Sequence, residues 1–324
     1  MIKLLGQFNS KKDKTRKWVF ENKNNEIIEI SLISNKNQDI LYIPTHYNCP
    51  LGYRECTLSS ISQNETLNPI RYEELMEAIG KVILDGDKRI STNTKILISF
   101  CGVGEPLLNM PLLERMYNEY SLEVFGYNKI GFEILTFMPN EDLNKLATNL
   151  KHPTRIIYRL SSPCDDKRKY LEPSTTLSVD TSLSYLKKYN DGILNDSDSK
   201  KKFKLFFGRK NPTEIRYCII PGVNDSLFEL ANLQYFQDRF QIPIAFLKNG
   251  NGEQEWIENI LSHYPKAKLS IEKTFGSDIG VQHGKFDESY YDASTSDNSK
   301  APSVCQLPKE KVQTIKKVLD NKVV

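Results

Sequence analysis

Short apolar runs alternate with amphipathic segments along most of this chain, and this alternation restricts the fold more than any other feature. The run Ile96–Phe100, bounded by Lys95 and by glycines, is typical of a buried strand in a parallel sheet. Further strands are expected at 130–136, 155–160, 214–220, 243–247 and 268–273, and helices at 72–85, 110–120, 141–149, 182–189, 227–240 and 255–264. Strands and helices in this order form βαβ units, so the sequence predicts an α/β fold with a parallel sheet or barrel.

The two ends of the chain follow other patterns. Strand-like runs separated by Asn/Lys turns predict a small antiparallel hairpin unit; they lie at 18–20, 26–33 and 40–44. The lysine-rich residues 1–16 are expected to be frayed, and the polar residues 190–202 to form a loop insertion. We therefore expect three parts. They are residues 1–45 as the hairpin unit, 46–286 as the α/β body, and 287–324 as a loop followed by a C-terminal helix near 309–320.

The composition is that of a soluble globular protein, with 39% hydrophobic residues. The 44 basic and 41 acidic residues leave a net charge of +3, which by itself gives no electrostatic reason to expect nucleic-acid binding. No apolar run is long enough to cross a bilayer, and the first residues lack the apolar core of a signal peptide. We therefore expect a cytoplasmic protein without membrane contact, whose six cysteines are thiols or metal ligands rather than disulfides.

A glycine turn with a carboxylate follows the run 96–100. Gly102 and Gly104 allow the backbone to turn sharply and to approach a ligand closely, and Glu105 comes next at the carboxyl end of the strand. Ligands of α/β folds bind at this end of the strands. We therefore predict that Glu105 accepts a cation or an amine of a ligand. The same residues also fit an ordinary strand-to-helix turn, so both interpretations stay open.

Several segments taken together resemble the RlmN/Cfr family of radical-SAM RNA methyltransferases. They are Lys17-Trp-Val-Phe20, Cys56-Thr-Leu-Ser59, Gly102-Val-Gly-Glu-Pro-Leu-Leu-Asn109, Leu160-Ser-Ser-Pro163, Ile219-Ile-Pro-Gly-Val-Asn-Asp225, Leu247-Lys-Asn249 and Lys273-Thr-Phe-Gly-Ser-Asp-Ile279. They follow the family's order and spacing over roughly residues 15–286. The resemblance implies a partial parallel (β/α) barrel, S-adenosylmethionine (SAM) as cofactor, and RNA or a nucleotide-like molecule as partner. The family's helical RNA-holding domain has no counterpart before the hairpin unit, which weakens the inference of the same RNA substrate.

The resemblance also implies a [4Fe–4S] cluster held by three thiolates of a Cys-x3-Cys-x2-Cys loop, with the fourth iron left for SAM. This chain differs in two ways. Six residues instead of the family's three separate Cys49 from Cys56, and Ser59 stands where the family has its third cysteine. Cys101 follows the strand 96–100 and Cys164 follows the strand 155–160, so both are expected on the same face as this loop. One of them, with Cys101 as the named substitute, is the alternative third ligand. The other interpretations are a structural zinc or redox site, or thiols left at an unused site.

The two cysteines through which the family transfers a methyl group are also replaced. Tyr42 stands at the first position and His283 at the second. Tyrosine cannot act as the resolving thiol and histidine cannot carry the methyl group as a thioether, so the family's adenine methylation is not expected. His283 is the candidate catalytic residue, as a general acid or base, with a plain loop histidine as the alternative. His46, beside the cluster loop, has the same two interpretations.

The resemblance assigns a SAM pocket to several strand ends. Its candidate residues are Gly102, Gly104, Glu105, Thr136, Arg159, Ser161 and Asn249. Arg159 stands where the family has a small hydroxyl, which favours a more anionic ligand such as a nucleotide phosphate, unless the side chain extends to the surface.

Two functions stay open on these residues. In the first, the chain binds SAM or a nucleotide-like ligand in the barrel mouth, with methyl transfer lost and with RNA or a protein as partner. In the second, it is an active radical-SAM enzyme that modifies RNA or a nucleotide through a reshaped cluster site. The serine at position 59 favours the first.

Overall fold

The computed structural model describes residues 1–11, 14–54, 56, 65–85, 95–119, 129–148, 151–220, 222–247, 262 and 268–270. Ten strands of these residues form one sheet, and their order in the sheet is their order in the chain. The first four strands pair antiparallel and the fourth to tenth pair parallel, so β4 belongs to both parts. The strands are β1 (Lys3–Asn9), β2 (Thr15–Glu21), β3 (Ile27–Ser34), β4 (Asp39–Ile43), β5 (Lys95–Phe100), β6 (Lys129–Thr136), β7 (Thr154–Leu160), β8 (Thr213–Cys218), β9 (Ile244–Leu247) and β10 (Lys268–Ser270).

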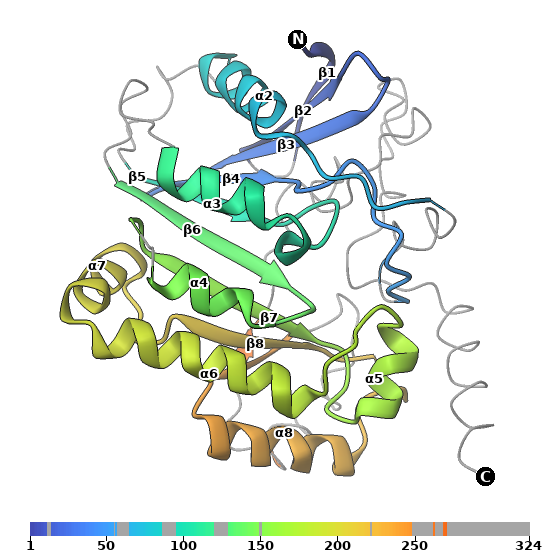
Figure 1. The fold of residues 1–324 in the computed structure, drawn as a ribbon, viewed down its shortest axis with the longest axis vertical. Coiled ribbons are helices and arrows are strands. Elements are labelled where there is room, and N and C mark those ends of the chain that lie inside the picture. The colour runs from blue at the N-terminus through green and yellow to red at the C-terminus, as the bar shows by residue number, and fades with distance from the viewer. Residues whose placement is uncertain are drawn as a thin grey trace.

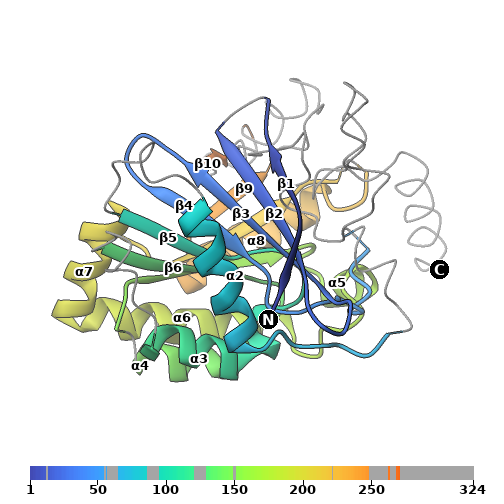
Figure 2. The same cartoon turned by 90° about the horizontal axis from the view of Figure 1, so that it is seen from above.

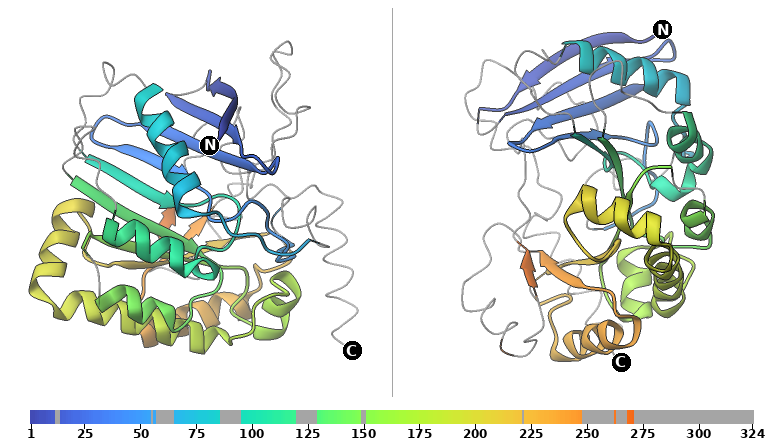
Figure 3. Two further views of the ribbon diagram at one scale, coloured as in Figure 1. Left: turned by 45° about the horizontal axis from the view of Figure 1, so that its top comes forward. Right: turned by 90° about the vertical axis from the view of Figure 1, so that its left-hand side faces the viewer.

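Helices cover one face of this curved sheet, as Figures 1 and 3 show. They are α2 (Tyr72–Asp85), the 3-10 turn η1 (Pro106–Leu108), α3 (Met110–Glu119), α4 (Asp142–Thr148), α5 (Asp165–Leu171), α6 (Val179–Asn195), α7 (Ser197–Phe207) and α8 (Leu227–Phe240). The observed architecture is therefore the predicted one, an unclosed and partly parallel (β/α) barrel extended by antiparallel strands. No helix of the described residues is long and apolar enough to cross a membrane.

The strands alternate between an apolar and a polar face. Ile96, Ile98 and Phe100 of β5 are fully buried in the main hydrophobic core, on the face that packs against the helices. Ser99 points to the opposite face, where its hydroxyl donates to Glu133 of β6 over 3.0 Å, and Glu133 forms a buried ion pair with Arg155 of β7. Ser99, Glu133 and Arg155 thus form one connected polar group on the face of the sheet that lies opposite the main core.

Two expectations about local structure are wrong. Residues 190–202 are helical, because α6 continues to Asn195 and the Asp196 carboxylate accepts from Ser199 N over 2.8 Å, which starts α7 at once. Residues 3–9 are not frayed but pair with β2 as β1.

Some expected features lie outside the described residues. These are the segment 287–324, nearly all of the expected helix 255–264, and the site residues Ser59, Asn249 and His283.

Candidate functional site

Glu105 lies at the carboxyl end of β5 and is 1% exposed. Its carboxylate caps η1 by accepting from Leu107 N over 3.3 Å, and it accepts from Thr136 Oγ1 over 2.5 Å and from Phe137 N over 3.0 Å. Burial raises the pKa of Glu105 to about 7, against the effect of these donors. A carboxylate offers about four acceptor positions, so roughly one is left for a further donor.

The glycine turn before Glu105 packs against the chain that follows β4. Gly104 has a φ of +95°, and a β-carbon there would lie 2.2 Å from His46 Nδ1. A β-carbon on Gly102 would lie 3.4 Å from the Cα of Pro44. The amides of Thr45 and His46 both donate to the carbonyl of Val103, over 3.1 and 3.2 Å. The close approach that these glycines permit is therefore an approach to the protein itself.

His46 is fully buried beside this turn. Its Nδ1 lies 2.9 Å from Thr45 Oγ1, and its Nε2 has no hydrogen-bond partner among the described residues. Burial lowers the pKa of His46 to about 4, so the ring is neutral at pH 7. The placement supports a positioning role for His46 under the Gly104 turn.

Residues 49–54, called the cysteine loop below, cross the carboxyl ends of the strands and pack against α5. The amide and Nε of Arg54 donate to the carbonyls of Leu171 and Tyr170 over 2.9 and 2.7 Å, and the guanidinium lies 4.2 Å from the Tyr170 ring centroid. Ser174 Oγ donates to the carbonyl of Leu51 over 2.6 Å. These contacts hold the segment 49–54 against the helix.

Tyr53 places this loop beside Glu105. Its ring stacks on Phe137 with the centroids 4.4 Å apart. Burial raises the pKa of Tyr53 well above its usual value, and the charge of Glu105 is the next cause. Cys49 is 6% exposed and packs in a small apolar cluster with Leu51, Tyr53 and Val103. The loop thus covers the candidate site with an aromatic ring.

The candidate cluster ligands do not converge among the described residues. In that part of the chain, no group of three or more His, Cys, Asp or Glu side chains is placed to hold a metal ion. Cys56 and Cys101 are half-buried. Cys164 is the residue before the first turn of α5, and burial raises the pKa of its thiol, which disfavours the thiolate that a metal needs. The described donors therefore do not fit a three-thiolate cluster.

Arg159 and Ser161 end β7 inside the molecule. Arg159 is 3% exposed, so it does not extend to the surface, and its guanidinium carbon lies 5.7 Å from the Phe137 ring centroid. It is in register with Arg216 of β8. The amide of Ser161 donates to Glu172 Oε1 over 3.0 Å, and Glu172 also pairs with the buried Arg168 over 2.9 Å. The structure thus groups Arg159 and Ser161 with Glu105 and Thr136 along adjacent strand ends.

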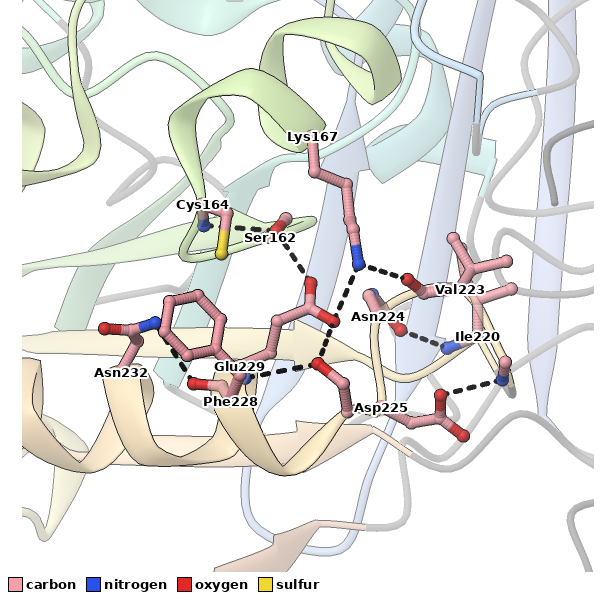
Figure 4. A network of polar contacts seen from close by, with 12 residues as sticks. Ser162, Cys164, Lys167, Ile220, Val223, Asn224, Asp225, Phe228, Glu229 and Asn232 are labelled. Atoms are coloured by element: carbon pink, nitrogen blue, oxygen red, sulfur yellow. Dashed lines mark hydrogen bonds and ion pairs between the residues drawn. The ribbon is translucent and has the colours of Figure 1, made fainter. Parts of the chain in front are cut away.

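A polar network connects the ends of β7 and β8 to the start of α8 (Figure 4). The sequence did not predict this network. Glu229, 1% exposed at the start of α8, accepts from Ser162 Oγ over 2.8 Å and from Lys167 Nζ and Ser226 Oγ over 2.9 Å each. Asn224 donates to the carbonyls of Ser161 and Cys218 over 2.7 and 2.9 Å. The Val-Asn-Asp motif was a signal for Asn224, whereas nothing in the sequence distinguished Glu229 from other helical glutamates.

No protein-family model matches this chain. A protein of Clostridium botulinum (strain Hall), named "Probable dual-specificity RNA methyltransferase RlmN", is 24% identical over 304 residues, which cover 89% of this chain and 80% of that protein. A protein of the same name from Chlorobium phaeobacteroides is 25% identical over 238 residues, which cover 72% of this chain and 60% of the other.

A similar fold is found in a solved structure, a radical SAM methyltransferase from Sphaerobacter thermophilus. The TM-score is 0.65 and the identity 17%, with 87% of this chain and 80% of that chain covered. At this identity the likeness shows the fold alone. Together with the order of the sequence segments, these comparisons show that the chain is a divergent relative of the RlmN proteins with a radical-SAM-type partial (β/α) barrel.

Proposed function

We propose that this chain binds SAM, or a nucleotide-like ligand with an amine, at the carboxyl ends of β5 to β8, and that it no longer performs the family's methyl transfer. The observation that carries the proposal is the Glu105 carboxylate, which is buried at a strand end with three protein donors and roughly one acceptor position left. An ammonium group donating to that position would compensate the buried charge.

Two neighbours of Glu105 suit the rest of such a ligand. Phe137 offers an aromatic ring on which a base can stack, and Tyr53 stacks there at 4.4 Å. Arg159, 5.7 Å from the same ring centroid, offers a cation to an anionic group of the ligand. A base that stacks on Phe137 would take the place of Tyr53, so ligand binding would shift the loop 49–54.

The loss of methyl transfer rests on the residues at the family's two cysteine positions. Tyr42 lies on β4 in register with Ser99, and a phenol cannot replace a resolving thiol there. Because the described donors do not fit a three-thiolate cluster, the proposal contains no radical step. The alternative proposal, a radical-SAM enzyme with a reshaped cluster, is favoured by the position of the cysteine loop across the strand ends.

Calorimetric titration with SAM tests the proposal. We expect Glu105→Gln to weaken SAM binding by about 1–3 kcal/mol, the scale of a charge-assisted hydrogen bond. Glu114→Gln is the matched control, because Glu114 is exposed on the neighbouring helix α3. Equal affinity of wild type and Glu105→Gln, with both proteins folded by circular dichroism, would show that Glu105 does not hold the ligand.

A further inference from the structure

A strongly basic surface lies at the end of the sheet where the parallel strands begin, away from the candidate site. Residues 197–210, which form α7 and the turn after it, contain six basic residues and one acidic residue, a net charge of +5. The whole chain has a net charge of only +3. Figures 1 and 2 show α7 at one end of the parallel strands and α5, which borders the candidate site, at the other end. The positive charge is therefore concentrated on this segment, although the chain as a whole is nearly neutral.

Lysines from three other segments extend this surface. Lys95 and Lys129 are in register at the starts of β5 and β6, and Lys95 Nζ donates to the carbonyl of Phe206 in α7. The charges of Lys151 and Lys202 both help to lower the pKa of His152, after its burial, so these two lysines flank the same ring. We call this set the α7 basic surface: Lys95, Lys129, Lys151, Lys200, Lys201, Lys202, Lys204, Arg209 and Lys210.

Little of this charge is neutralised by neighbours. Arg209 pairs with Glu214 over 2.9 Å. Within the described part of the chain, Lys200, Lys201, Lys202, Lys204 and Lys210 form no ion pair, although all five are exposed. Elsewhere on the surface such partners are present, as for Lys187 of α6, which lies 2.6 Å from Asp191. The α7 basic surface therefore presents a positive field to solvent.

The helix that carries these lysines is held firmly. Phe203 and Phe206 of α7 are buried. The Phe206 ring fills the space above Gly131 of β6, where a β-carbon would lie 2.3 Å from a ring atom. Lys95 Nζ also lies 4.4 Å from the centroid of that ring. The lysines are thus displayed on a packed element rather than on a loose tail.

The residue types identify the partner. Lysine is depleted in the cores of protein–protein interfaces, where aromatic residues and arginine are enriched. Lysines clustered along one helix are the footprint of nucleic-acid binding, in which point charges contact phosphates without reading the sequence. We propose that the α7 basic surface binds the phosphate backbone of nucleic acid. This surface is separate from Glu105, so the inference does not depend on the proposed ligand site.

The test is fluorescence anisotropy with a labelled 30-nucleotide RNA hairpin and the DNA hairpin of the same sequence, in a salt series. One variant combines Lys200→Gln, Lys201→Gln, Lys202→Gln and Lys204→Gln. The matched control removes the same charge from exposed lysines of the antiparallel strands and their turns: Lys3→Gln, Lys14→Gln, Lys23→Gln and Lys36→Gln. Melting curves of all three proteins establish that they are folded.

We expect the α7 variant to bind at least about tenfold more weakly than the control variant. Each lost phosphate contact should lower the slope of log affinity against log salt by about 0.7–0.9. Tighter binding of one hairpin would identify RNA or DNA as the source of the phosphates. Equal losses in the two variants, no hairpin binding by the wild type at low salt, or equally strong binding of poly-glutamate would overturn the proposal.

Discussion

The imidazole of His46 lies directly against the α-carbon of Gly104, so that a β-carbon at this position would be 2.2 Å from Nδ1. The contact joins the chain after β4 to the turn after β5, and the turn itself holds Gly104 at a φ of +95°. Both the missing side chain and the backbone angle therefore require glycine. The orientation of Glu105, the next residue, depends on this contact.

Gly104→Ala should lower the free energy of unfolding by about 2–4 kcal/mol, because it adds a steric clash to an unfavourable backbone conformation. Urea unfolding followed by circular dichroism measures the change. Gly80→Ala is the control: Gly80 lies within α2, and nothing lies within 4 Å of a β-carbon built there. That control should gain about 0.5–1 kcal/mol from helix propensity. A Gly104→Ala protein as stable as the wild type would contradict the observed contact.

The pH dependence of stability should reveal Glu105 and His46 as opposing groups. The folded-state pKa of Glu105 is raised by burial to about 7, so its contribution is fully present below about pH 4.5 and is lost as pH rises to 7. The pKa of His46 is lowered by burial to about 4, so its contribution is lost as pH falls from about 6.5 to 4. Between pH 4.5 and 6.5 the two effects have opposite signs.

Glu105→Gln should therefore remove the opposing contribution of Glu105 and leave the pH dependence of stability that His46 causes. We expect the variant to lose up to about 3 kcal/mol more than the wild type between pH 6.5 and pH 4.5, since one pKa unit corresponds to 1.36 kcal/mol. Urea midpoints at several pH values give the comparison. Parallel curves for the two proteins would mean that the pKa of Glu105 is not raised in the folded state.

Local elements were predictable from the sequence because their signals are local. The bounds of α2 and α8 follow the predicted 72–85 and 227–240, since both helices have a regular apolar period or a clear serine cap. The sequence did not predict α7, because Asp196 and the serines after it are as typical of a loop as of a helix start. The packing of Phe206 on Gly131 stabilises the helix. That contact joins residues far apart in the chain.

The candidate site was predictable only in part for the same reason. Glu105 and Thr136 were both expected at strand ends, and they form a hydrogen bond. Their position beneath Tyr53 depends on how the cysteine loop docks on α5, which no spacing in the sequence reports. The Glu229 network likewise depends on the register of β7 and β8, which brings Ser162 and Lys167 to the start of α8.

Glu229→Gln should destabilise the protein by about 1–3 kcal/mol, because it removes the carboxylate that accepts from three donors in a buried position. Glu73→Gln is the matched control, since Glu73 pairs with Arg115 at an exposed site, where such pairs contribute at most about 1 kcal/mol. Thermal or urea unfolding of both variants measures the difference. Equal effects would show that the network does not hold the ends of β7 and β8.

Bound iron separates a cluster-free ligand-binding protein from an active radical enzyme. Ser59→Cys restores the third cysteine of the family's loop, so it should increase bound iron only if Cys49 and Cys56 can still act as ligands. We expect no gain, because Cys49 is 6% exposed within an apolar cluster that includes Tyr53 and Val103. Thiolates that ligate metals need a site from which the proton can leave and the charge can be compensated.

The measurement is iron and sulfide content after anaerobic reconstitution of wild type and Ser59→Cys. Ser60→Cys provides the control for a thiol added one residue away, at a position outside the family's spacing. A stoichiometric, reducible cluster in Ser59→Cys but not in Ser60→Cys would show that the loop can rearrange to hold iron. The same cluster in the wild type, together with cleavage of SAM, would replace the proposed binding function by radical chemistry, because the loop would then have to release Cys49 from Tyr53.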